Sequence, residues 1–279
     1  PTFATAGPSK GKSSASTPTH WKERLAIPAV LVAALFAITT VWGFTRPASP
    51  PPLARYQIEL PAGAGIGSGN WSPLAVSPDG SKLVYAGETG RLFLRTRDQL
   101  DPVEIPGSES AFNPFFSHDG KRIGFMSGAP GSAEIKVAEL SGGPPTTVIS
   151  TGVGGPGAAF GYDGYIYFDA SGVGPLRRVR VTGGAAEDAS VRDSAGGELQ
   201  HNWPDPLPNG RGMLMVLDRA GPGVNVATTN DIAVLDLATR KHKVLMRGVY
   251  ARYAASGHIL YVTSRGVLMA VPFDEDRME

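Results

Sequence analysis

A short phrase returns along the chain at nearly even spacing. Leu74–Tyr85 read Leu-Ala-Val-Ser-Pro-Asp-Gly-Ser-Lys-Leu-Val-Tyr, and Pro114–Phe125 read Pro-Phe-Phe-Ser-His-Asp-Gly-Lys-Arg-Ile-Gly-Phe, which places their aspartates 40 positions apart. Weaker copies follow at Gly161–Phe168, Leu207–Met215 and Ala255–Val262. Repeats of about 40–50 residues built from short strands are typical of a β-propeller. The sequence therefore predicts an all-β propeller with about five blades present.

The centre of each copy has the composition of a tight turn. Proline fixes φ at the first central position, aspartate can bond its own backbone, and glycine adopts the left-handed conformation that closes the turn. We assign a structural role in these turns to Ser77, Pro78, Asp79, Gly80, Ser117, Asp119, Gly120, Asp163, Gly164, Asn209 and Gly210. A ring of metal-binding carboxylates is the alternative for the repeated aspartates, but the turn alone explains their repetition.

Pairs of apolar segments accompany the turns. One segment follows each turn directly and another comes about ten residues later, as hairpins require. Their apolar residues do not alternate cleanly with polar ones, because a blade between two neighbours is covered on both faces. The expected strands are 82–86, 92–95, 122–126, 135–138, 165–168, 176–181, 213–217, 232–237, 259–262 and 267–271. The fifth unit ends without further outer strands, so we expect an incomplete ring.

The sequence before the repeats has three distinct parts. Residues 1–19 carry too little apolar surface to fold and are expected to be a disordered linker. Leu25–Phe44 contain 20 residues without a charge, the length of one transmembrane helix, which with its flanks covers residues 20–46. Residues 47–55 form a proline-rich spacer, and residues 56–279 form the propeller, incomplete at its C-terminus.

A signal peptide and a buried helix are the alternatives to a membrane anchor. The apolar part of a signal peptide is shorter, and the remaining sequence offers no other helix for a buried one to contact. Basic residues are more frequent before the span than after it; they are Lys10, Lys12, Lys22 and Arg24 before it, and Arg46 and Arg55 after it. This bias predicts a single-pass protein of the cell (inner) membrane, with a cytoplasmic N-terminus and an extracytoplasmic propeller.

Composition and motif content disfavour several function classes. The net charge is +1 and no basic stripe is present, so nucleic acid is not expected as a partner. There is no cysteine, and His118, His242 and His258 show no metal-ligand spacing. Gly63–Gly69 lack a following helix and a Lys-Ser/Thr pair, so they are not a nucleotide loop. We expect no cofactor, no metal and no catalysis from the residues present.

The densest polar and aromatic cluster consists of Glu198, His201, Trp203 and Asp205. A histidine with a carboxylate can act in acid–base chemistry, but the sequence has no Gly-x-Ser-x-Gly elbow to supply a nucleophile. Hydrogen bonding between blades is the simpler interpretation. We retain these four residues as a candidate binding cluster.

The whole layout resembles the C-terminal part of bacterial transmembrane serine/threonine protein kinases whose extracytoplasmic domain is a TolB-type, WD-like propeller. The resemblance covers about residues 20–279 and rests on phrases such as Tyr56–Pro61, Asn113–Gly120, His201–Pro204, Gly257–Tyr261 and Ala270–Asp274. It implies a sensor domain for signal transduction that binds an unknown protein, peptide or small molecule, and a kinase domain located before Pro1. The sequence departs from the pattern at His118 and at Gly161-Tyr162, which replace Pro and Ser-Pro.

Two other functions remain open. The propeller of a prolyl-oligopeptidase-like hydrolase carries similar repeats, and its catalytic domain would lie C-terminal to them. A periplasmic TolB-like scaffold would have a cleaved signal and no long cytoplasmic leader. The full reading frame discriminates among the three functions.

Overall fold

The computed structural model describes residues 36, 60, 65–67, 72–129, 132–219 and 230–279. The chain divides into two compact units, Pro1–Gln57 and Ile58–Glu279. Except for Phe36, the predicted linker, the predicted span Leu25–Phe44 and the proline-rich spacer lie outside the described residues. Among the residues that the structure describes, no helix is both long enough and apolar enough to cross a membrane.

The second unit is built from strands and turns, and its described residues from Ser72 onward contain no helix. Its strands are β1 (Leu74–Val76), β2 (Lys82–Ala86), β3 (Leu92–Thr96), β4 (Val103–Glu104), β5 (Ala111–Phe116), β6 (Arg122–Ser127), β7 (Ala133–Glu139), β8 (Thr146–Phe160), β9 (Tyr165–Ala170), β10 (Leu176–Arg180), β11 (Glu187–Asp188), β12 (Glu198–Pro206), β13 (Gly212–Arg219), β14 (Asp231–Asp236), β15 (His242–Arg247), β16 (Tyr250–Ala254), β17 (His258–Val262) and β18 (Leu268–Pro272). The all-β prediction is therefore confirmed for this part of the chain.

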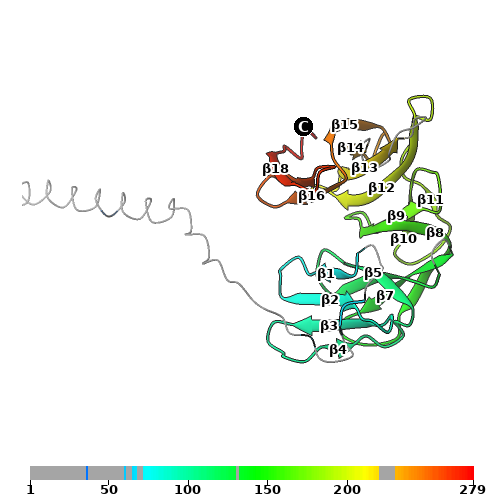
Figure 1. Cartoon of the computed structure of the whole chain (residues 1–279), viewed down its shortest axis with the longest axis vertical. Helices are drawn as coiled ribbons and strands as arrows, with labels where there is room; N and C mark the ends of the chain where they lie inside the picture. The colour runs from blue at the N-terminus through cyan, green and yellow to red at the C-terminus, as the bar shows by residue number, and fades with distance from the viewer. Residues whose placement is uncertain (1–35, 37–59, 61–64, 68–71, 130–131, 220–229) are drawn as a thin grey trace, which may run out of the picture. The chain divides into compact units, whose positions relative to one another are not determined.

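The strands pair in chain order into antiparallel meanders. Blade 1 is β1-β2-β3-β4, blade 4 is β12-β13-β14-β15, and blade 5 is the three-stranded sheet β16-β17-β18. Strands β5 to β11 form one seven-stranded sheet that contains blades 2 and 3. Figure 1 shows the sheets following one another around an arc, with β1 and β18 in the first and last blades. This is the succession of blades that the repeat predicts.

Blades 2 and 3 share the long strand β8, which the repeat did not predict. The first half of β8 pairs with β7, where Ile149 lies opposite Ile135, and its second half pairs with β9, where Ala159 lies opposite Tyr167. The pairing with β9 is irregular between Val153 and Ala158. The chain thus passes from the outer edge of one blade to the inner strand of the next without a separate turn.

The ten predicted strands agree closely with observed ones: β2 has the predicted bounds, and the other nine differ by one or two residues at one or both ends. Several central strands, such as β6, β9 and β13, contain continuous runs of buried residues rather than burial on alternate residues. In β13, for example, the six residues from Gly212 to Leu217 are all buried. A blade packed between two others exposes neither face, which explains the apolar runs.

The hydrophobic core consists of four layers, one between each pair of neighbouring blades. Val84 and Phe125 meet between blades 1 and 2, and Phe115 and Phe168 lie in the layer between blades 2 and 3. The layer between blades 3 and 4 contains Leu176, Met213, Met215, Leu217, Ala233 and Leu235. The layer between blades 4 and 5 contains Leu214, Ile232, Val234, Ala251 and Ile259. The stack of layers fixes the position of each inner strand relative to the next.

The outer faces of the two terminal blades expose apolar side chains. Leu74 and Val76 of β1 are 41% and 57% exposed, and Leu268 of β18 is 68% exposed. The opposite face of each terminal blade is buried against its neighbour, as Val84 and Ile259 illustrate.

Candidate functional site

The repeated aspartates are engaged in their own turns. Asp79 accepts hydrogen bonds from the Ser77 hydroxyl (2.5 Å), the Ser81 hydroxyl (2.7 Å) and the Ser81 amide (3.1 Å). The hydrogen bonds from Ser77 and Ser81 lower the pKa of Asp79. Asp119 repeats the arrangement with the Ser117 hydroxyl (2.6 Å) and the Lys121 amide (3.1 Å). The carboxylate oxygens of both aspartates therefore accept hydrogen bonds within their own turns, which is the structural role that the repeat indicated.

The third and fourth turns use the same geometry with different partners. Asp163 accepts hydrogen bonds from the Tyr165 amide (3.3 Å) and the Tyr167 hydroxyl (2.7 Å), and Asn209 accepts one from the Arg211 amide (2.9 Å). The turn glycines all have positive φ, namely Gly80 (68°), Gly120 (64°), Gly164 (81°) and Gly210 (68°). Side chains at these positions would be strained, which explains why glycine returns in each copy.

The two departures from the repeat motif contact each other. The His118 ring stacks on the Tyr162 ring with centroids 3.5 Å apart, and His118 Nε2 lies 2.5 Å from the Phe160 carbonyl oxygen. Burial lowers the pKa of His118. The turn around His118 still closes, because the Gly120 amide donates to the Ser117 carbonyl (2.9 Å). The departures therefore place an aromatic pair between blades 2 and 3.

A cavity of about 670 Å³ lies among the inner strands of all five blades. Its lining comes from β1, β5, β8, β12 and β16 and from the turns that follow them; prominent members are Ser72, Phe115, His118, Ala158, Tyr162, Asp205, Tyr250 and Arg252. The lining contains both apolar and charged groups. This volume is within the range of about 300–1,000 Å³ that ligand pockets occupy.

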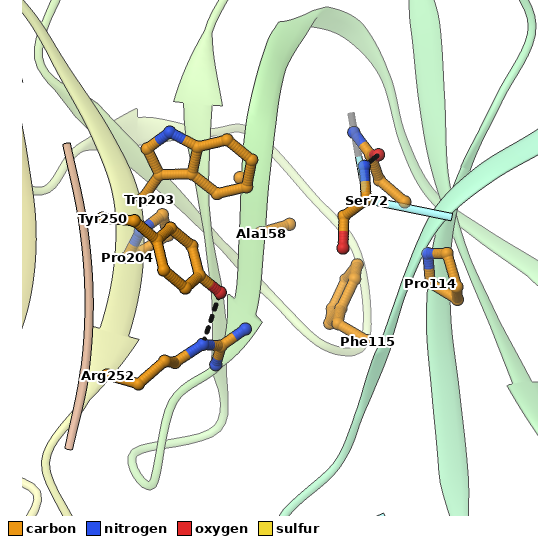
Figure 2. A pocket seen from close by; sticks show the side chains of 10 residues that line it. Ser72, Pro114, Phe115, Ala158, Trp203, Pro204, Tyr250 and Arg252 are labelled. Carbon is orange, nitrogen blue, oxygen red and sulfur yellow. Dashed lines mark hydrogen bonds between the residues drawn. The ribbon is translucent and has the colours of Figure 1, made fainter. Parts of the chain in front are cut away.

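A narrower niche at the cavity has an aromatic and charged wall. In Figure 2, Trp203, Tyr250 and Arg252 lie on one side and Ser72, Pro114 and Phe115 on the other. The rings of Trp203 and Tyr250 meet edge to face with centroids 5.2 Å apart. Arg252 Nε donates to the Tyr250 hydroxyl at 2.8 Å, as the dashed line in Figure 2 marks.

Asp205 fixes the position of Arg252 in this wall. It accepts hydrogen bonds from Arg252 Nη1 (2.8 Å) and from the Tyr253 amide (2.7 Å). Because Asp205 belongs to β12 and the donors belong to β16, these bonds connect blades 4 and 5. Arg252 is positioned by two partners while 53% of its side chain stays exposed. A ligand in the niche can therefore meet a fixed guanidinium next to two aromatic rings.

Irregular backbone shapes the niche. Asn113 and Trp203 have positive φ values of 48° and 55°, and each precedes a proline in an inner strand. The pairing of these strands shifts register at the same places, between Phe112 and Phe115 and between Asn202 and Asp205. Left-handed conformations of residues other than glycine are costly and often occur at functional positions.

A buried carboxylate holds Trp203 in this conformation. Asp169 is fully buried and accepts hydrogen bonds from the Trp203 amide (3.0 Å) and the Gly157 amide (2.7 Å). Burial raises the pKa of Asp169 well above its usual range. A Cβ atom at Gly157 would lie 2.8 Å from the Trp203 backbone. This close approach of β8 and β12 explains a glycine at that position.

The four residues of the predicted cluster separate into two places. Trp203 and Asp205 line the cavity, whereas Glu198 and His201 lie at the other end of β12, buried at 3% and 0% exposure. Glu198 Oε2 is 3.1 Å from His201 Nε2, and Glu198 Oε1 is 2.9 Å from His242 Nε2 of β15. The sequence spacing gave no sign that His242 joins this cluster.

Further partners complete the network around Glu198. The Asp193 amide donates to Glu198 Oε2 (2.7 Å), and the Ser190 hydroxyl lies 2.7 Å from His201 Nδ1. Burial alone would raise the pKa of Glu198, but the hydrogen bonds from the Asp193 amide and both imidazoles lower it. Burial lowers the pKa of His201. Ser190, His201 and Glu198 thus form a hydrogen-bonded series. Ser190 is only 2% exposed, so a substrate carbonyl cannot reach its hydroxyl.

Sequence reasoning missed Tyr250, Arg252, Asp169, Ser190 and His242. Prolines in the inner strands at Pro114 and Pro204 were a usable signal for the niche, because proline in a strand marks an irregularity. Nothing in the local sequence distinguishes Asp169 from an exposed aspartate. Its role depends on the distant amides of β8 and β12.

No protein-family model matches the chain, and no curated protein matches it. Among solved structures it is similar to an Agrobacterium tumefaciens protein that carries the name TolB (TM-score 0.52, 16% identity, 74% of this chain and 76% of that one). It is also similar to TolB from Acinetobacter baumannii (TM-score 0.51, 19% identity, 72% and 53%) and to the tricorn protease (TM-score 0.52, 13% identity, 72% and 25%). The chain therefore spans about half of the second protein and a quarter of the third. At these identities the similarity shows the fold alone, which is that of a TolB-type β-propeller.

Proposed function

We propose that this propeller is the extracytoplasmic ligand-binding domain of a membrane-anchored, receptor-like serine/threonine protein kinase. The observation that carries the proposal is the central cavity, where Trp203, Tyr250 and Arg252 form a preorganised wall. Aromatic side chains and arginine dominate binding energy at protein interfaces. The kinase assignment rests on the sequence resemblance, and the sensor role follows from it.

The chemistry of the niche favours a peptide or small molecule with an apolar group next to an acceptor. The apolar group would lie against Trp203 and Tyr250, and the acceptor would meet the exposed face of the Arg252 guanidinium. Asp205 keeps the guanidinium in place through its 2.8 Å contact. We propose no catalytic role for any of these residues and no nucleic acid partner.

Panning a library of random peptides on the 279-residue chain tests the proposal. Peptides that bind should lose affinity by about 10-fold or more in Trp203→Ala and in Arg252→Ala, since interface hot spots are worth about 2 kcal/mol or more each. Arg265→Ala is the matched control because Arg265 is exposed in a turn away from the cavity lining. Peptides that bind all three variants equally would contradict binding in the cavity.

Two alternatives have specific support. The fold similarity to the tricorn protease favours a propeller that accompanies a hydrolase domain, and the similarity to the TolB structures favours a periplasmic scaffold. The reading frame around this chain distinguishes them. A kinase domain upstream of Pro1 supports the receptor; a hydrolase downstream of Glu279, or a cleaved signal directly before the propeller, contradicts it.

A further inference from the structure

We propose that Glu198, His201 and His242 form a binding site for a single divalent transition-metal ion of the zinc class. Their ligand atoms lie within 4.8 Å of one another. Two imidazole nitrogens and one carboxylate oxygen form a ligand set that zinc uses in proteins, with water in the fourth position. The site is separate from the central cavity and does not depend on the ligand proposed there.

The distances suit coordination as well as hydrogen bonding. His201 Nε2 and His242 Nε2 lie 3.1 and 2.9 Å from the two oxygens of the same carboxylate. In a tetrahedral arrangement, ligand atoms about 2.0–2.2 Å from a zinc ion are separated by about 3.3–3.6 Å, so both contacts must lengthen slightly to admit an ion. An ion can therefore replace the shared protons with small side-chain shifts.

The surroundings already orient the ligands. Ser190 Oγ lies 2.7 Å from His201 Nδ1 and also accepts a hydrogen bond from the Leu176 amide (3.0 Å). A serine oxygen has two lone pairs, so it can accept from an Nδ1–H as well and leave Nε2 free for the metal. The Asp193 amide fixes the carboxylate in the same way (2.7 Å). Partners of this kind set the tautomer and orientation of metal-binding histidines.

Two of the three ligand side chains are buried, and the third is partly accessible to solvent. The side chains of Glu198 and His201 are 2% and 0% exposed, whereas His242 is 12% exposed. His242 comes from β15 and the other two ligands come from β12. An ion would enter past His242 and join the first and last strands of blade 4.

Two neighbouring arginines oppose the ion: Arg192, whose Nη1 donates to the Glu198 carbonyl oxygen (3.3 Å), and Arg219, which provides a test. Arg219 Nη2 lies 3.5 Å from Glu198 Oε1, while its Nε lies 2.8 Å from Asp231 Oδ2. Asp231 offsets the guanidinium charge in part. Replacing Arg219 by glutamine should therefore increase metal affinity about 10-fold, even with the screening of bulk water.

The experiment measures ion binding by the 279-residue chain, freed of tags and stripped with a chelator. We expect the protein to bind one Co²⁺ with visible absorption bands of a nitrogen- and oxygen-ligated tetrahedral site. Zn²⁺ should displace Co²⁺ and raise the melting temperature. His242→Ala should lower Zn²⁺ affinity by more than about 100-fold, because even second-shell partners contribute 10–100-fold. Ser190→Ala should lower it by about 10-fold.

His258→Ala is the matched control, because this histidine lies in β17 and interacts with Ser256 rather than with the cluster. It should bind Zn²⁺ as the wild type does. Failure of the wild type to bind Co²⁺ or Zn²⁺, or an unchanged affinity in His242→Ala, would overturn the proposal and leave a hydrogen-bonded network. His242 lies at the edge of the blade, so His242→Ala should fold. If its circular dichroism spectrum is unchanged, a loss of Zn²⁺ binding cannot be attributed to unfolding.

Discussion

Replacing Asp169 by alanine should destabilise the propeller through one identifiable set of contacts. The carboxylate is the acceptor for the buried amides of Gly157 and Trp203, at 2.7 and 3.0 Å. A buried donor left without a partner costs about 1–3 kcal/mol, so the two amides together cost about 2–6 kcal/mol. Removing the cost of burying this carboxyl group, whose pKa is raised by burial, offsets part of the loss. We expect a net decrease of about 2–4 kcal/mol in the free energy of unfolding.

Urea denaturation of the 279-residue chain measures this change, provided that the m value stays constant. Asp188→Ala is the control, since the Asp188 side chain is 62% exposed and its ionic contact with Arg177 spans 3.7 Å. The control should change stability by less than about 0.5 kcal/mol. If Asp169→Ala were as stable as the control, Asp169 would not hold β8 and β12 together.

The pH dependence gives a second test of the same residue. Burial raises the folded-state pKa of Asp169 above the unfolded value of about 3.9. Its contribution to stability is therefore fully present below about pH 3.9 and is lost as the pH rises through the folded-state pKa. Asp169→Asn does not titrate, so the stability of the wild type relative to this variant should fall as the pH rises. A difference that stays constant or grows with pH would refute the assigned direction.

The remaining predictions concern packing and topology. Gly124→Ala should lose about 1–3 kcal/mol in thermal or urea denaturation, because the new Cβ would lie within 2.4 Å of two Phe115 ring atoms; unchanged stability would show that the ring can move freely. Leu268→Lys should change the free energy of unfolding by less than about 0.5 kcal/mol, because Leu268 is 68% exposed. Ile259→Ala should lose about 2–5 kcal/mol, because Ile259 is fully buried. Equal losses would mean that the face of β18 is covered. If Leu25–Phe44 cross the membrane as predicted, protease added to spheroplasts should digest the propeller and spare an N-terminal epitope, and the reverse pattern would contradict the orientation.

The fold was predictable from the sequence because its determinants are local and repeated. Turns such as Ser77–Gly80 specify hairpins within a few residues. The runs that follow them are apolar because both faces of a blade are covered. The same pattern of turn and apolar segment recurs in each copy, so each hairpin supports the prediction of the others. The shared strand β8 was missed because Gly154-Gly155-Pro156-Gly157 have the composition of a turn, whereas the structure continues β8 through these residues.

The candidate site was predictable only in part. The sequence predicted Trp203 and Asp205 as part of one cluster with Glu198 and His201, because the four residues are close in sequence. In the structure the two pairs lie at opposite ends of β12. Their actual partners, such as Arg252 and His242, come from other strands 47 and 44 positions away. Contacts of this range depend on how the blades pack, and one sequence contains no local signal for them.

Hydrogen–deuterium exchange with a peptide selected on the wild-type chain tests binding in the cavity most directly. A ligand against Trp203, Tyr250 and Arg252 should slow exchange of amides in the inner strands β12 and β16. It should leave the outer strands β4 and β15 unchanged, because their residues do not line the cavity. Protection confined to β12 and β16, and absent in Trp203→Ala, is the predicted result. Protection of β4 or β15 with no change in β12 and β16 would place the ligand on the outer surface and contradict a binding site in the central cavity.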